Sequence, residues 1–169
     1  MSPRNDEKKR VDAYIGLGAN LGHRRDAIGR AIDAIGALPD IDVAAISDLY
    51  ETPARFVEDQ PDFINAAAHL TTSLSPHDLL DTLLAIEHAM GRKRQCERLE
   101  KGPRVIDLDI LFYADRVIDD EGLTIPHPDL HNRRFVLEPL CDIAPEFVHP
   151  TLGKTVALLL ETLGSASPK

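Results

Sequence analysis

The sequence has few cysteines, no long apolar run and no apolar segment near its start. Cys96 and Cys141 lie far apart and outside any CxxC or Cys/His pattern, so a disulfide framework and a zinc site are both disfavoured. No apolar stretch approaches the roughly 20 residues that a membrane-spanning helix requires. The polar opening MSPRNDEKKR lacks the apolar core of a secretory signal. We therefore expect a soluble cytoplasmic protein with free thiols and no membrane partner.

The chain also lacks the overall basic charge of a nucleic-acid binder, since its formal net charge is −9. Cations gather in residues 91–104, where six Lys and Arg accompany two Glu, a local +4 that leaves −13 for the remainder. Such a cluster on an acidic protein fits a compact, highly charged anion, although a solvated charged loop is the alternative. No P-loop or dinucleotide fingerprint is present, so arginines and a metal would have to hold any nucleotide phosphates.

Length and composition are those of one globular domain. The 169 residues are 43% hydrophobic and 28% charged, enough for a single core, and no repeat or low-complexity linker interrupts them. We predict a polar tail at 1–10, a single domain at 11–163 and a second tail at 164–169.

Hydrophobic periodicity predicts an alternation of strands and helices. Period-two patterns predict strands over Val11–Gly18, Ile41–Leu49, Phe63–Leu70 and Val105–Tyr113, with a polar connection at 52–62. Three-and-four spacing predicts helices over His23–Leu38 and from Ser75 to Met90, the second opened by an N-cap serine and a proline. The order β-α-β-β-α-β predicts a ferredoxin-like α/β (α+β) sandwich. A C-terminal elaboration follows, with a short helix near Val156–Leu163.

The last predicted strand carries two aspartates on one face. Alternation places Asp107, Asp109 and Leu111 on that face, and Ile106, Leu108, Ile110 and Phe112 on the other. The two carboxylates would stand about 6.5 to 7 Å apart along the backbone. A cation would keep both ionised, and oxygen ligands suit Mg²⁺, although two solvated aspartates are the alternative. Arg104 directly precedes this strand, as charge neutralisation in phosphoryl transfer requires.

Several motifs in register resemble the 6-hydroxymethyl-7,8-dihydropterin pyrophosphokinase family. GPRVIDLDIL at 102–111 is similar to the family signature GPRxxDLDIL, and five further motifs follow the family's order and spacing: YIGLGANLG, YETP, DQPDFINAA, IEHAMGR and IPHPDLHNRRFVLEPL. The resemblance implies a ferredoxin-like fold and diphosphate transfer from ATP to 6-hydroxymethyl-7,8-dihydropterin in folate biosynthesis, with AMP as second product. It further implies two Mg²⁺ ions and, in many members, a monomer.

The resemblance also implies roles for individual residues. Asp107 and Asp109 match the metal ligands, and Arg92 and Arg104 match arginines that engage the transferring phosphates. The positions that match the ATP site are Glu87, Arg94, Arg98, Ile110 through its backbone, Thr124, His127 and Arg133. Those that match the pterin site are Thr52, Pro53, Phe63, Asn65 and Phe135, where an amide can pair with the heterocycle edge and aromatic rings can stack on it. A core role is the alternative for each phenylalanine, and a structural hydrogen bond for His127.

One departure from the family pattern falls in the basic segment. The family commonly has a tryptophan in ERWGPR, whereas this chain reads ERLEKGPR, about two residues longer, and contains no tryptophan. Loss of that ring weakens the expected closure over the pterin. It motivates a second hypothesis, a non-catalytic module that binds pterin or nucleotide. The pairing of two aspartates with Arg92 and Arg104 favours the enzyme.

Overall fold

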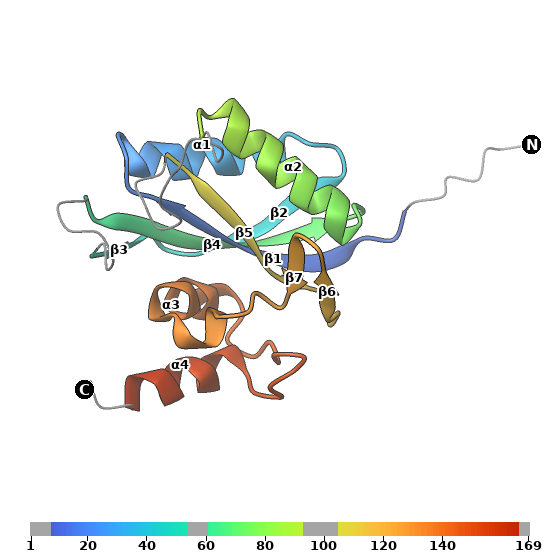
Figure 1. The fold of residues 1–169 in the computed structure, drawn as a ribbon, viewed down its shortest axis with the longest axis vertical. Helices are drawn as coiled ribbons and strands as arrows, with labels where there is room; N and C mark the ends of the chain where they lie inside the picture. The colour runs from blue at the N-terminus through green and yellow to red at the C-terminus, as the bar shows by residue number, and fades with distance from the viewer. Residues whose placement is uncertain (1–7, 54–60, 93–104, 166–169) are drawn as a thin grey trace, which may run out of the picture.

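The computed structural model describes residues 8–53, 61–92 and 105–165. Its centre is an antiparallel sheet in the order β2-β4-β1-β5, with β3 paired to part of β4 (Figure 1). The strands are β1 (Val11–Ala19), β2 (Ile41–Ile46), β3 (Tyr50–Thr52), β4 (Phe63–Thr72), β5 (Asp107–Tyr113), and the hairpin β6 (Ile118–Asp120) and β7 (Leu123–Ile125). The helices are α1 (Arg24–Gly36), α2 (Pro76–Ala89), the 3-10 turn η2 (Leu130–Asn132), α3 (Arg134–Ile143) and α4 (Val156–Ser165). The predicted ferredoxin-like arrangement is confirmed.

Helices cover both faces of the sheet (Figure 1). On one face the first core joins α1 and α2 to the sheet through residues such as Ile28 and Leu83. On the other face the second core packs α3 and α4 against Tyr14, Ala67 and Phe112. The sequence predicted only the first of these layers in detail. None of the helices in the described ranges is long and apolar enough to cross a membrane.

The predicted capping of α2 is confirmed. Ser75 lies just before the helix in an extended conformation, and its side-chain oxygen accepts a 3.1 Å hydrogen bond from the Asp78 amide. Pro76 occupies the first helical position, where its missing N–H costs nothing. Among the cysteines, Cys141 is a free thiol, as predicted, and Cys96 lies outside the described residues.

The strict alternation predicted for the aspartate strand is wrong at one position. Tyr14 pairs with Phe112 and Ile15 with Ile110, so Leu111 is an extra residue that forms a β-bulge. Leu111 and Phe112 therefore both contribute to the second core, while Ile110 and Tyr113 contribute to the first. Phe112 does not share a face with Ile110, and β5 begins at Asp107 instead of Val105.

The strand predicted over Ile41–Leu49 ends three residues early. β2 ends at Ile46, and the Ser47 side chain then accepts a 2.8 Å hydrogen bond from the Ala67 amide. The chain pairs with β4 again as β3, which lies beyond the predicted strand and reaches the first residue of the predicted polar connection. The final helix extends to Ser165, two residues beyond its predicted end.

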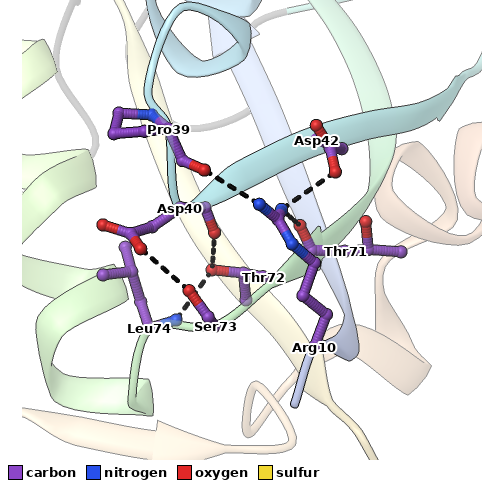
Figure 2. Close-up of polar contacts among 8 residues, drawn as sticks. All are labelled: Arg10, Pro39, Asp40, Asp42, Thr71, Thr72, Ser73 and Leu74. Carbon is purple, nitrogen blue, oxygen red and sulfur yellow. Dashed lines mark hydrogen bonds and ion pairs between the residues drawn. The ribbon is translucent and has the colours of Figure 1, made fainter. Parts of the chain in front are cut away.

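A polar cluster fastens the end of the sheet where β1 begins (Figure 2). The Arg10 guanidinium donates a 2.8 Å hydrogen bond to the Pro39 carbonyl and forms a 2.9 Å ion pair with Asp42. Beside it, the Thr72 hydroxyl donates to the Asp40 carbonyl at 2.9 Å. The cluster thus ties the turn after α1 to the end of β4.

We expect Thr72→Val to destabilise the fold measurably. Thr72 is fully buried, and its hydroxyl also accepts a 3.1 Å hydrogen bond from the Leu74 amide, so valine removes both hydrogen bonds and leaves the part-buried Leu74 amide without this acceptor, while the Asp40 carbonyl keeps the Ser73 amide. The free energy of unfolding in urea should fall by about 1–3 kcal/mol. Thr71→Val is the control, because the cluster uses the Thr71 backbone carbonyl, and it should change stability by less than about 0.5 kcal/mol. An equal loss of stability in both variants would contradict a stabilising role for the Thr72 hydroxyl.

Candidate functional site

The centre of the candidate site is a pair of glycines, Gly16 and Gly18, on one face of β1. In β1, Ile15, Leu17 and Ala19 point into the first core, so Gly16 and Gly18 face the opposite side. Gly18 pairs with Asn65 of β4 and with Asp107 of β5, and Gly16 pairs with Ala67 and Asp109. A Cβ atom added at Gly18 would lie 3.4 Å from the Asn65 Oδ1 atom. The two glycines therefore add no side chain between an amide and two carboxylates; the Leu111 side chain lies against Gly16, and the surface beside Gly18 is called the floor below.

The sequence correctly places Asp107 and Asp109 on one face of β5. Both are partly buried, and the Asp107 side chain is 18% exposed. Leu108 and Ile110 point into the first core, which fixes the orientation of the strand. Within the described ranges, no cluster of three or more His, Cys, Asp or Glu could hold a metal ion. A carboxylate pair is nonetheless a suitable donor set for Mg²⁺, which commonly completes its shell with water and substrate phosphates.

Arg92 is buried beside these carboxylates. Its Nη1 atom lies 2.5 Å from Asp107 Oδ1, 3.1 Å from Glu87 Oε1 and 3.2 Å from the Ile106 carbonyl oxygen. Glu87 is 1% exposed, and its Oε1 atom also accepts a 2.7 Å hydrogen bond from the Leu108 amide. Glu87 therefore connects the end of α2 to both Arg92 and β5. This places Glu87 behind Arg92, where it would act on a ligand through the arginine.

The predicted pterin residues that the structure places near one another lie on β3 and β4. Ile64 and Ala66 of β4 belong to the first core. The residues that alternate with them, Phe63 and Asn65, therefore lie on the opposite side of the sheet, which Gly16 and Gly18 also face. Asn65 is 7% exposed, and its Nδ2 atom donates a 2.7 Å hydrogen bond to the Thr52 hydroxyl. Pro53 follows β3 and is exposed. The Thr52 contact fixes which way the Asn65 amide points.

The β-bulge brings His127 to the same strand as the aspartates. The His127 amide donates a 3.0 Å hydrogen bond to the carbonyl of the bulged Leu111. Burial lowers the pKa of His127 below its ordinary value, and the Arg133 guanidinium lowers it further, against opposing effects of nearby carboxylates. Its Nδ1 atom is buried and has no hydrogen-bond partner among the described residues. The neutral imidazole thus keeps an unused nitrogen.

The remaining predicted residues are spread around this centre. Arg133 lies 3.5 Å from an Asp129 carboxylate oxygen and 5.8 Å from the centre of the Phe135 ring, which is half-buried. Thr124 is exposed on β7. The Ile110 side chain lies in the first core, which leaves only its backbone for a ligand. Arg94, Arg98 and Arg104 lie outside the described residues.

Gly16 and Gly18 are not among the site residues predicted from the sequence. The predicted strand Val11–Gly18 contains them, and their alternation with Ile15, Leu17 and Ala19 indicates a strand with little side-chain cover on one face. The spacing of two residues between these glycines in a predicted strand indicates that they share one face.

Comparisons with known proteins agree with the motif resemblance. A family model described as 7,8-dihydro-6-hydroxymethylpterin-pyrophosphokinase (HPPK) matches residues 14–145. The 2-amino-4-hydroxy-6-hydroxymethyldihydropteridine pyrophosphokinase of Synechocystis sp. is 45% identical over 162 residues, which cover 95% of this chain and 80% of that protein. The folic acid synthesis protein fol1 of Pneumocystis carinii is 44% identical over 89% of this chain but only 20% of its own length.

A solved structure supports the fold independently. The crystal structure of Plasmodium falciparum HPPK-DHPS A437G with SDX-DHP matches with a TM-score of 0.74, at 17% identity, over 94% of this chain and 46% of that one. At that identity the match concerns the fold alone. This chain therefore spans less than half of that protein and a fifth of fol1.

We expect Glu87→Gln to destabilise the protein. Glutamine keeps the size of the side chain but removes the charge that faces the buried Arg92 guanidinium. The free energy of unfolding in urea should fall by about 1.5–3 kcal/mol, the usual contribution of a hydrogen bond to a charged group. Asp81→Asn removes the same charge from an exposed position on α2 and should change stability by less than about 0.5 kcal/mol. Similar losses in both variants would show that helix charge, and not the buried contact, is responsible.

Proposed function

Because the chain belongs to the 7,8-dihydro-6-hydroxymethylpterin-pyrophosphokinase family, it transfers pyrophosphate from ATP to 6-hydroxymethyl-7,8-dihydropterin, and we propose that the residues around Gly16 and Gly18 perform this transfer. The observation that carries the proposal is the register of β1. It sets the Asn65 amide on one side of the glycines and Asp107, Asp109 and Arg92 on the other. A heterocycle held at the amide would thus present its substituent toward the charged side.

The Asn65 side of the floor is proposed to bind the pterin. One hydrogen of the Asn65 amide is used by Thr52, so the second hydrogen and the oxygen can pair with the donors and acceptors on the pterin edge. Phe63 lies on the same face of β4, and Phe135 is the second residue of α3, the helix that packs on that side of the sheet. Both are half-buried, so their rings can stack on a flat bicycle.

The carboxylate side is proposed to receive the phosphates of ATP. Asp107 and Asp109 would hold Mg²⁺, with two ions expected from the family resemblance, and bound Mg²⁺ neutralises phosphate charge during transfer. Arg92 is held in place by Glu87 and supplies a fixed positive charge beside Asp107. Arg104, Arg94 and Arg98 are proposed to add cations from the basic segment. His127, Arg133, Thr124 and the Ile110 backbone are proposed to contact ATP.

In the proposed reaction, the pterin hydroxymethyl oxygen attacks the β-phosphorus of ATP. The new oxygen–phosphorus bond forms as the bond between that phosphorus and the bridging oxygen of the α-phosphate breaks. AMP leaves with the bridging oxygen, and the hydroxyl proton is released. The chain's contribution is to align the two substrates across the floor and to stabilise charge. We propose further that the protein works as a cytoplasmic monomer.

Incubation with ATP, Mg²⁺ and 6-hydroxymethyl-7,8-dihydropterin should yield AMP that depends on the pterin. Asp109→Asn should lower kcat by more than about hundredfold, because loss of a metal ligand exceeds the 10- to 100-fold effect of an outer-shell partner. Asp119→Asn removes an exposed carboxylate on β6 and should leave kcat unchanged. Formation of ADP would indicate an ordinary kinase. Pterin binding without turnover would support the non-catalytic module, and near-normal turnover of Asp109→Asn would refute the metal assignment.

Gly18→Ala should weaken pterin binding with little effect on ATP. The added methyl group would lie 3.4 Å from Asn65 Oδ1 and occupy the floor. We expect the pterin KM to rise about tenfold, equivalent to about 1.4 kcal/mol. Gly16→Ala is the matched control, since the atoms nearest to its methyl group would be those of Leu111, at an ordinary 3.5 Å, and the pterin KM should change less than about twofold. An equal rise in both variants would argue against a floor centred on Gly18.

A further inference from the structure

The three-residue strand β3 is held by a contact from each of its side chains. Glu51 faces α1, whereas Tyr50 and Thr52 face the opposite side of the sheet. A strand this short, at the margin of a sheet, has little backbone pairing of its own and would open easily. Its side-chain contacts must therefore set its position against Phe63, Ile64 and Asn65 of β4.

On the α1 side, Arg24 connects β3 to the residue that directly precedes β4. Its Nη1 atom lies 3.1 Å from Glu51 Oε1 and donates a 2.5 Å hydrogen bond to the Asp62 carbonyl. Asn20 is fully buried next to α1, and its Nδ2 atom donates a 3.3 Å hydrogen bond to the Pro61 carbonyl. The start of α1 thus holds β3 and the residues that lead into β4 at a fixed separation.

On the other side, Asp142 of α3 holds the same strand. The Tyr50 hydroxyl lies 2.8 and 2.9 Å from the two Asp142 carboxylate oxygens, and the Asp48 amide donates a 3.3 Å hydrogen bond to one of them. Hydrogen bonding to Asp142 raises the pKa of Tyr50 to about 12. The phenol therefore remains a neutral donor at physiological pH.

We propose that Arg24 and Asp142 are positioning residues for the pterin, an inference that rests on the function proposed above. They hold β3 from its two sides, so that the Thr52 hydroxyl stays 2.7 Å from Asn65 Nδ2 and fixes the orientation of the amide. If β3 moves, Asn65 loses the hydrogen bond to Thr52, and its side-chain amide can rotate so that the nitrogen and the oxygen exchange places. Recognition of the pterin then weakens, although neither positioning residue touches it.

A matched pair of arginines separates positioning from general stability. Arg10 makes the same kinds of contacts as Arg24, an ion pair with a carboxylate and hydrogen bonds to backbone carbonyls (two for Arg10, one for Arg24), but at the opposite end of the sheet (Figure 2). Exposed ion pairs of this kind contribute little to global stability, so Arg10→Ala and Arg24→Ala should lower Tm by similar small amounts. Only Arg24→Ala should raise the pterin KM, by about tenfold, equivalent to about 1.4 kcal/mol, with the ATP KM within about twofold.

A second matched pair tests the α3 side. Tyr50→Phe removes the hydroxyl that Asp142 accepts, while Tyr113→Phe removes one that donates to the Leu74 carbonyl, away from β3. Tyr50→Phe alone should raise the pterin KM severalfold. Hydrogen exchange adds a readout that does not require turnover, since the amides of residues 50–52 should exchange about tenfold faster in Arg24→Ala than in Arg10→Ala.

The outcomes distinguish this inference from the proposed function. Wild-type protein that gives no pterin-dependent AMP would refute the function, whereas active wild-type protein with unchanged pterin KM in Arg24→Ala and Tyr50→Phe would refute only the positioning role. Equal rises in the KM of ATP and pterin, or equal exchange in the two arginine variants, would also overturn it. A pterin-specific rise together with faster exchange of β3 would support it.

Discussion

The site depends on the burial of the Arg92 guanidinium between Glu87 and Asp107. A buried charge is costly unless it is paired and hydrogen-bonded, and this one is both. The arrangement connects three segments, because Glu87 ends α2, Arg92 follows it, and Asp107 begins β5. The helix layer and the aspartate strand consequently cannot move independently without separating these charges.

The central position of β1 gives this network a neighbouring surface on which a ligand can lie. β1 pairs with β4 on one side and with β5 on the other, so one strand connects the amide of Asn65 to the carboxylate of Asp107. Its apolar residues stabilise the first core, and its glycines add no side chain to the other face. The short sequence IGLGA thus stabilises the core on one face of the sheet and leaves room for a ligand on the other. The short strand β3 then completes the margin of this surface from the β4 side.

The sequence predicted those features that follow from local patterns. The Ser75 cap of α2, the shared face of Asp107 and Asp109 and the order of the main elements depend on neighbouring residues, and the structure contains all three. The bulge and β3 both depend on residues that are distant in the sequence. Leu111 is an extra residue only with respect to β1, and Tyr50 forms a strand only by pairing with Asn65. Helix α3 contains Pro139, a residue that normally argues against a helix interior, and packing of Leu137 and Leu140 outweighs it. The contacts of Arg24 and Asp142 join residues far apart in the chain, so no local pattern could have predicted them.

The bulge at Leu111 divides β5 into two parts whose residues alternate differently between the two cores. Before it, the residues that alternate with the aspartates pack under α1 and α2; after it, Phe112 packs under α3 and α4 while Tyr113 returns to the first side. Beyond the bulge, each residue of β5 thus faces the side of the sheet opposite to the one that strict alternation would give it. The packing of Phe112 on the C-terminal helices is therefore separate from the orientation of Asp107 and Asp109, which lie before the bulge. Deletion of the single extra residue would remove that independence.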